Sequence, residues 1–169
     1  PTPTPTPAVK SEEKKTIVKK KEKKVYDFGP MAIKTYDYVT KNEPEIVKSY
    51  LPSKVKKAMV DGKQNLFISA TRGGSWITFK VDDGEVKQRT LKKGQSIRLV
   101  GEIIRIFFGN VNGTTVFLNN RPLKIHTKTG VKSLVFPKTK RKDYVLPMFI
   151  FQEDGSVITS EDYLNRNNN

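Results

Sequence analysis

Few side chains in this sequence could carry acid, base or metal chemistry. His126 is the only histidine, and the chain has no cysteine, so it can form neither a disulfide nor a thiolate metal site. One histidine cannot build a zinc site without cysteines or well-placed carboxylates. Catalysis by His126 would need a nucleophile and an orienting partner, and the sequence has no nucleophile elbow or triad signature. We therefore expect His126 to be a structural or surface residue.

Two acidic pairs, Asp82-Asp83 and Glu153-Asp154, have the composition of paired catalytic acids. Each pair precedes a glycine, and this pattern predicts a hairpin turn because Asp and Gly tolerate positive φ. Glycosidase carboxylates lie in a cleft rather than at hairpin tips. Gly73-Gly74 lacks the downstream lysine and helix of a phosphate-binding loop, and no calcium-loop spacing occurs. The sequence thus predicts a protein that is not an enzyme and holds no cofactor or metal, with a hydrolase as the weakest alternative.

The chain is strongly basic, with a formal net charge of +15 and a pI near 9.9. Such a charge attracts polyanions, such as nucleic acid, anionic lipid surfaces or anionic cell-wall polymers; the alternative is a solvated lysine-rich surface. The lysines are expected to concentrate in the terminal segments rather than between exposed aromatic residues, which predicts weak, salt-sensitive attraction without specific readout. Nucleic acid is therefore not the expected partner. The possible polyanion contacts are Lys138, Lys140, Arg141 and Lys142.

The elements that must position these side chains change in type along the chain. Hydrophobic residues make up 36% of it, which predicts one core domain with polar flanks. The expected parts are a flexible Pro/Thr- and Lys-rich linker over 1–24, a strand and helix extension that packs on the core over 25–60, a β domain over 61–137, a basic loop and C-terminal hairpin over 138–165, and a frayed tail over 166–169. Asn42 is expected to cap a helix that Pro52 interrupts, and Ser53 to cap a second one.

From residue 64 onward the apolar residues recur with a period of two. Short strands separated by turns about 8–12 residues apart predict a mainly β fold, either a sandwich or a small β-barrel. Trp76 is the largest apolar side chain available, and we expect it to fill the core between the sheets. Gly109 is expected to permit a turn or bulge in which Asn110 hydrogen-bonds its own backbone.

No run of about 18 apolar residues occurs, so no segment of this sequence is expected to span a membrane. The chain opens on Pro1 within a Pro-Thr repeat. We expect it to be an excised fragment of a protein with an upstream targeting or anchoring segment.

Several short motifs follow one another through the β region. They are Ser75-Trp76, Asp82-Asp83-Gly84, the stretch 91–94, Gly109-Asn110 and the stretch 113–120. Over about residues 64–136 the series resembles the C-terminal extracytoplasmic domain of RodZ-like bacterial cell-shape proteins. The residues that carry the resemblance are Trp76, Asp83, Gly84, Gly94, Gly109, Asn110, Gly113 and Asn119. Where family members usually have Asn-Gly, this chain has Asn119-Asn120, and asparagine also tolerates the left-handed conformation.

The resemblance implies an immunoglobulin-like β-sandwich in the periplasmic or extracytoplasmic space, tethered to the bacterial inner membrane. The full protein would have a cytoplasmic helix-turn-helix domain that contacts the bacterial actin MreB, then one transmembrane helix, a proline-rich linker and this domain. Its role would be to scaffold the machinery that elongates the peptidoglycan wall. Its partners would be membrane or cell-wall synthesis proteins, or peptidoglycan itself, and no catalytic residues carry over. The alternative function is a general polyanion- or nucleic-acid-binding β module.

Overall fold

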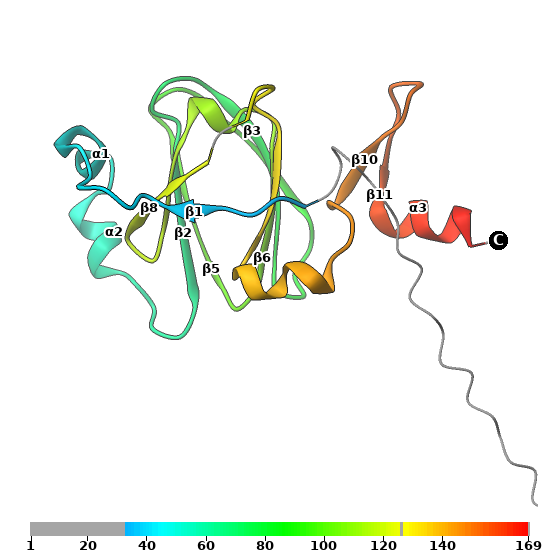
Figure 1. Cartoon of the computed structure of the whole chain (residues 1–169), viewed down its shortest axis with the longest axis horizontal. Coiled ribbons are helices and arrows are strands. Elements are labelled where there is room, and N and C mark those ends of the chain that lie inside the picture. The colour runs from blue at the N-terminus through cyan, green and yellow to red at the C-terminus, as the bar shows by residue number, and fades with distance from the viewer. Residues whose placement is uncertain (1–32, 126, 169) are drawn as a thin grey trace, which may run out of the picture.

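The computed structural model describes residues 33–125 and 127–168, in which two antiparallel sheets pack face to face (Figure 1). The five-stranded sheet has the order β1 (Asp37–Tyr38), β8 (Arg121–Lys124), β7 (Thr115–Leu118), β2 (Gln64–Ser69), β5 (Ser96–Gly101). The four-stranded sheet has the order β4 (Lys87–Leu91), β3 (Ser75–Val81), β6 (Ile104–Phe108), β9 (Lys132–Phe136). The predicted mainly β fold is therefore confirmed. The expected linker over 1–24, the segment 25–32 and His126 lie outside the described residues.

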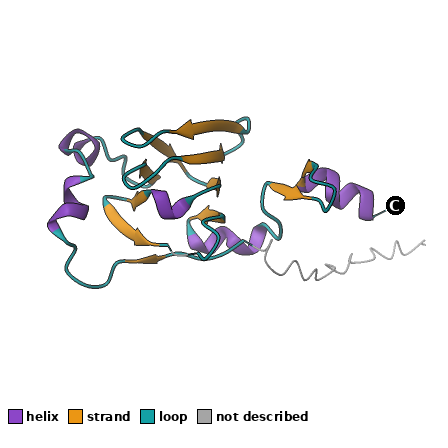
Figure 2. Cartoon of the chain, turned by 90° about the horizontal axis from the view of Figure 1, so that it is seen from above, coloured by secondary structure: helices purple, strands orange, loops and turns teal. Residues whose placement is uncertain are grey.

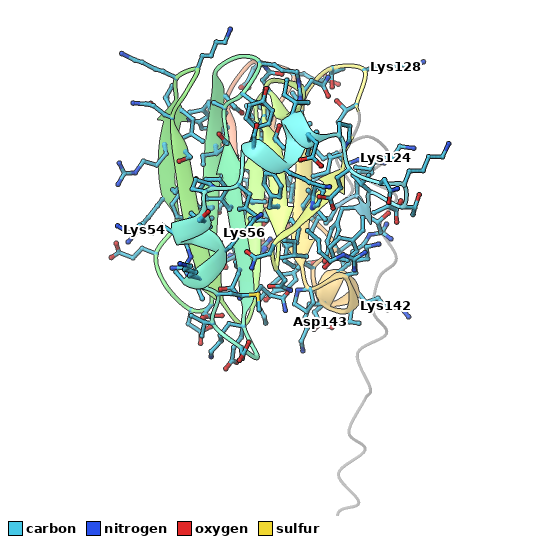
Figure 3. The ribbon with its side chains drawn as sticks, turned by 90° about the vertical axis from the view of Figure 1, so that its left-hand side faces the viewer. Lys54, Lys56, Lys124, Lys128, Lys142 and Asp143 are labelled. Atoms are coloured by element: carbon cyan, nitrogen blue, oxygen red, sulfur yellow. The ribbon has the colours of Figure 1, made fainter. Side chains whose placement is uncertain are left out.

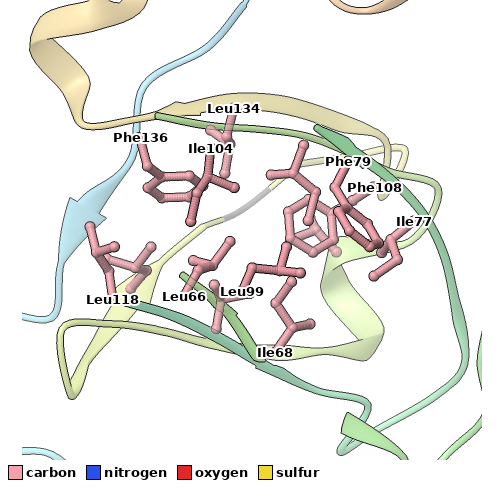
Figure 4. Packing of buried hydrophobic residues seen from close by; sticks show 14 of the residues in the cluster. Leu66, Ile68, Ile77, Phe79, Leu99, Ile104, Phe108, Leu118, Leu134 and Phe136 are labelled. Atoms are coloured by element: carbon pink, nitrogen blue, oxygen red, sulfur yellow. The ribbon is translucent and has the colours of Figure 1, made fainter. Parts of the chain in front are cut away.

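The space between the sheets is filled by the residues that face inward from both. In the five-stranded sheet, Leu66 lies opposite Leu99 on one side and Leu118 on the other. In the four-stranded sheet, Ile77 lies opposite Phe108. All five side chains belong to one buried hydrophobic cluster (Figure 4). Burying apolar area contributes about 25 cal/mol per Å² to stability, so this cluster is what holds the two sheets together.

The turns between strands use residues that accept a positive φ. Asn119 and Asn120 have φ values of 51° and 65° and join β7 to β8 in a two-residue hairpin. The prediction that this turn tolerates Asn-Asn is confirmed, because both residues adopt the left-handed conformation that such a hairpin needs. Asp82 has φ 50° in the predicted turn after β3. Its carboxylate accepts hydrogen bonds of 2.8 Å from the N–H groups of Glu102 and Ile103, so it ties this turn to the connection between β5 and β6.

Two short helices, α1 (Glu45–Ser49) and α2 (Ser53–Lys57), cover the outer face of the five-stranded sheet (Figures 1 and 2). They form a second buried cluster whose members are Leu51, Phe67 and Phe117, with Val47, Tyr50 and Val55 packed against it. The prediction that Asn42 and Ser53 cap these helices is wrong. Pro44 and Pro52 occupy the cap positions, and no side chain caps either helix. A proline is favourable there because its fixed φ suits the start of a helix.

The C-terminal part of the chain lies on the opposite side of the sandwich, against the four-stranded sheet (Figure 1). It contains the hairpin β10 (Phe149–Phe151) and β11 (Val157–Thr159), followed by α3 (Ser160–Asn167). Its own small cluster comprises Leu146 and Ile150, with Ile158, Tyr163 and Leu164 packed against them. The guanidinium of Arg105 on β6 joins this part to the sheet, because it donates to the Leu146 carbonyl at 3.2 Å and lies 4.3 Å from the centre of the Tyr144 ring.

The predicted hairpin is confirmed, but the prediction of a frayed end over 166–169 is wrong for its first two residues, because α3 continues to Asn167. The Thr159 hydroxyl accepts a hydrogen bond from the Asp162 N–H at 3.1 Å and lies 2.6 Å from an Asp162 carboxylate oxygen. The Thr159 side chain therefore caps the helix, and the sequence signature of this helix start is Thr159-Ser-Glu-Asp162.

Replacing Phe108 by alanine should destabilise the domain by about 3–5 kcal/mol, because Phe108 is fully buried between the sheets. The matched control is Phe151→Ala, which removes the same side chain from a site that is 50% exposed and should cost less than about 1 kcal/mol. Urea denaturation followed by circular dichroism measures both values. Equal losses for the two variants would contradict the described core.

The stability of the domain should fall between about pH 10 and pH 12 because of Tyr36. Burial raises the pKa of this phenol to about 12 from an ordinary value of 10.0. In this window the unfolded chain releases the proton while the folded chain retains it, so rising pH favours unfolding. The Tyr36→Phe variant lacks this proton, so its free energy of unfolding should decline less steeply from pH 10 to pH 12 than that of the wild type. Parallel declines would show that Tyr36 is not buried as described.

Candidate functional site

The only tryptophan lies on the outside of the sandwich, so the prediction that Trp76 fills the core is wrong. Successive residues of a strand point to opposite faces of the sheet. Ile77 and Phe79 on β3 face the core, and this alternation places Trp76 on the outer face of the four-stranded sheet, where it is half-buried. The carbonyl of Trp76 accepts a hydrogen bond from the Gly109 N–H at 2.8 Å. A Cβ on Gly109 would lie 3.6 Å from the indole ring, so glycine leaves room for this ring.

Trp76 is the first of three aromatic side chains in contact, which we call the aromatic row: Trp76, Phe107 and Phe151. The rings of Trp76 and Phe107 pack edge to face with centroids 5.6 Å apart, and Phe107 and Phe151 are also 5.6 Å apart. Phe107 is 6% exposed, whereas Phe151 is 50% exposed. Val157 pairs with Phe151 across the hairpin and is 48% exposed. The aromatic row therefore runs from a half-buried Trp76 over a buried Phe107 to a half-exposed Phe151, whose cross-strand neighbour Val157 is also apolar and half exposed.

Asn110 organises the loops at the end of the sandwich where β3 begins. Its side-chain N–H donates to the Gly74 carbonyl at 3.0 Å, and its side-chain oxygen accepts from the Gly113 N–H at 3.2 Å. Its own backbone N–H donates to the Ser75 hydroxyl at 3.2 Å. A Cβ on Gly113 would lie 2.8 Å from the Asn110 amide nitrogen, too close for any side chain. The prediction that Asn110 bonds nearby backbone is confirmed, and the amide also holds a loop that lies 36 residues away in sequence.

The other motif residues lie elsewhere and also shape turns. Asp83 and Gly84 lie in the turn at the far end of β3, where the Gly84 N–H donates to the Val81 carbonyl at 3.0 Å. Gly94 has φ +89° in the connection between β4 and β5. The side-chain oxygen of Asn119 accepts from the Asn65 N–H at 2.9 Å. The structure therefore distributes the motif residues over both ends of the sandwich and does not bring them together into one site.

The acidic pairs take part in turns, as the sequence predicts. Asp154 lies in the turn between β10 and β11, where its carboxylate accepts from the Ser156 hydroxyl at 2.6 Å and from the Ser156 N–H at 2.8 Å. These hydrogen bonds lower the pKa of Asp154, so this carboxyl stays ionised and is a poor general acid. Within residues 33–125 and 127–168, no group of three or more histidine, aspartate or glutamate side chains could hold a metal ion.

The basic stretch from residue 138 lies in a 3₁₀ helix, Lys138–Asp143, whose cations contact protein groups. Lys138 pairs with Asp37 at 3.0 Å, and its ammonium lies 4.9 Å from the centre of the Tyr36 ring. Arg141 donates to the Ile33 carbonyl at 2.7 Å. Lys140 pairs with Asp143 at 3.4 Å within the helix itself. Lys138 and Arg141 thus hold the segment before β1 against the sandwich, and this use of them was not evident from the sequence.

The prediction that Lys138, Lys140, Arg141 and Lys142 contact a polyanion stays a prediction. All four residues are exposed, and Figure 3 shows Lys142 at the surface. The lysines do concentrate in the flanking segments, because 17 of the 25 lie outside residues 61–137, but the β domain also carries an excess of positive charge. Residues 61–137 alone carry 13 lysines and arginines against 5 aspartates and glutamates. The β domain itself is therefore basic.

One comparison with known proteins finds a match to part of the sandwich. Residues 68–134 match the family model of the RodZ C-terminal domain. No curated protein and no solved structure matches the chain. The matched segment runs from β2 to β9 and includes Trp76, Asn110 and both turns at the ends of β3. Residues 68–134 are therefore similar to the RodZ C-terminal domain, which is a domain of a cell-shape family.

Proposed function

We propose that this chain is the extracytoplasmic scaffold domain of a membrane-anchored RodZ-like protein that helps to organise cell-wall elongation and cell shape. In this proposal the domain has no catalytic activity and binds membrane or cell-wall synthesis proteins in the periplasm. The family match over residues 68–134 supports the proposal. None of the helices among the described residues is long and apolar enough to cross a membrane.

The observation that carries the proposal is that the polar motif residues hydrogen-bond to the protein backbone. The side chains of Asp82, Asn110 and Asn119 all hydrogen-bond to backbone groups of other loops and strands. A catalytic group must instead reach a substrate with its hydrogen-bonding atoms. Since these residues build the fold, the surfaces that remain suit binding better than chemistry.

The aromatic row is the surface that best fits a protein partner. Tryptophan and phenylalanine are enriched at the centres of protein interfaces, where a few buried aromatic side chains supply most of the binding energy. Phe151 and Val157 are half exposed, and Phe151 contacts the buried ring of Phe107, which in turn contacts the half-buried ring of Trp76. A partner that covered them would extend an aromatic cluster already anchored in the sheet.

The immunoglobulin-like character of the sandwich is part of the proposal. Strands β2 and β5 pair in one sheet, while β3, β4 and β6 pair in the other. The chain therefore crosses between the sheets after β2, after β4, after β5, after β6 and after β8. Crossings of this kind interlock the sheets in Greek-key sandwiches.

The proposal predicts that Val157→Ser in the full-length protein impairs rod shape in a strain that lacks the chromosomal copy. The same change should reduce copurification of cell-wall synthesis proteins at least about tenfold, because loss of an interface hot spot costs more than the roughly 1.4 kcal/mol that a tenfold change requires. Phe151→Ser should act in the same direction. Light microscopy and quantitative affinity purification measure the two effects.

The matched control is Val131→Ser, which makes the same change at a site of similar exposure, 45% against 48%, away from the aromatic row. It should preserve both shape and copurification. Normal shape and undiminished copurification in the Val157→Ser and Phe151→Ser strains, at wild-type protein levels, would contradict the proposed partner surface.

A further inference from the structure

A groove opens along one side of the sandwich, between the outermost strands of the two sheets. β4 is the last strand of the four-stranded sheet, and β5 is the last strand of the five-stranded sheet. The groove has a volume of about 540 Å³, and its lining includes Arg89 and Leu91 from β4, Gln95 from the connection, and Ile97 and Arg98 from β5. The two sheets therefore remain open along this edge.

The register of β4 explains why this edge is charged. Arg89 lies opposite Ile77 and Lys87 lies opposite Phe79, so both cations share the face of the sheet that elsewhere packs into the core. At this outer strand the core no longer covers that face, and both residues are exposed. The side chains that would close the sandwich in an apolar protein are here cations, and Arg89 lines the groove.

The positive charge of the edge is uninterrupted. Residues 87–101 contain five cations and no aspartate or glutamate; the cations are Lys87, Arg89, Lys92, Lys93 and Arg98. None of these five takes part in an ion pair among residues 33–125 and 127–168. Arg89 and Arg98 line the groove itself, and the other three cations lie on β4 and on the connection that border it. Such a concentration of one sign in and beside a concave surface raises the local concentration of anions.

Arg98 is held in place at the wall of the groove. Its guanidinium donates to the Ala58 carbonyl and lies 3.5 Å from the side-chain oxygen of Asn65. Ala58 ends α2, so the helix and the groove are neighbours. Figure 3 shows Lys54 of α2 on the same side of the molecule as β5, whereas Lys124 and Lys128 lie on the other side.

Inward-pointing charges on outer strands also prevent sheets from pairing edge to edge. Charges of either sign would give that protection. Edge protection alone does not explain why all five charges on the two strands and their connection are positive. An exclusively positive edge favours a ligand of negative charge.

The lining of the groove restricts the kind of anion. No aromatic residue lines it, so it lacks the stacking platform on which proteins bind the bases of single-stranded nucleic acid. The cations follow one another along the edge rather than surrounding a single point, which suits repeated anionic groups on an extended chain. Arginine and lysine both bind phosphate groups well.

We propose that the groove between β4 and β5 binds an extended polymer of phosphodiester groups without bases, of the polyol-phosphate kind. The proposal rests on the proposed function only in that an extracytoplasmic domain would meet such a polymer at the cell wall. The binding itself is a property of Arg89, Lys92 and their neighbours and can be measured on the isolated chain without any partner protein.

The test measures binding of the full chain to fluorescently labelled poly(glycerol phosphate) by anisotropy at about 0.15 M salt. The double variant Arg89→Gln/Lys92→Gln should bind at least about tenfold more weakly than the wild type. The matched control Lys124→Gln/Lys128→Gln removes the same charge from exposed sites outside the groove and should change binding less than about twofold. Equal losses in both double variants would overturn the proposal in favour of diffuse attraction.

A second variant separates binding from edge protection. Arg89→Glu/Lys92→Glu keeps charges on the outer strand, so it should stay monomeric in sedimentation, yet it should lose binding of the polymer altogether. Retained binding would overturn the proposal. So would tighter binding of single-stranded DNA, of polyglutamate or of vesicles containing anionic lipid than of poly(glycerol phosphate). A normal cell shape in Val157→Ser strains would contradict the proposed partner surface but would not affect these binding results. The partner surface and the polymer-binding groove are therefore tested independently.

Discussion

Ile77 and Phe108 lie opposite each other in the four-stranded sheet, and both side chains point toward the five-stranded sheet and fill the space between the two. The alternation of a β-strand then leaves no choice for their neighbours. Trp76 and Phe107 must point outward, and together they form the covered beginning of the aromatic row. The same alternation, carried across to β4, places Arg89 and Lys87 at the open edge. Both surfaces that we assign to binding are therefore consequences of which residues fill the core.

The polar motif residues hold the connections between the strands in place. Asn110 at one end of β3 and Asp82 at the other each use a side chain to hold backbone N–H or carbonyl groups of separate connections. Buried or partly buried backbone groups need such partners, because an unpaired one costs as much as a lost hydrogen bond. These motif residues thus stabilise loops, and the outer face and the edge of the sandwich are the surfaces that we propose for binding.

Sequence reasoning found most of the strands and turns, because the period of two and the Asp-Gly and Asn-Asn signals are local. It misplaced Trp76, since β3 has apolar residues on both faces and the size of a side chain does not say which face is inside. It missed α3, although Thr159-Ser-Glu-Asp162 has the pattern of a helix start. The contacts of Arg141 with Ile33 and of Asn110 with Gly74 join distant parts of the chain, and no local pattern could predict them.

Ile77 and Phe79 of β3 face the core, whereas Trp76 lies on the outer face of the sheet, where a partner could cover it. Because Trp76 is the only tryptophan, its fluorescence reports on this one position. Acrylamide quenching of the folded chain measures its accessibility directly. A half-buried Trp76 predicts a quenching constant between that of the unfolded chain and that of a fully buried indole. A folded chain whose tryptophan acrylamide cannot quench would place Trp76 in the core and contradict the account.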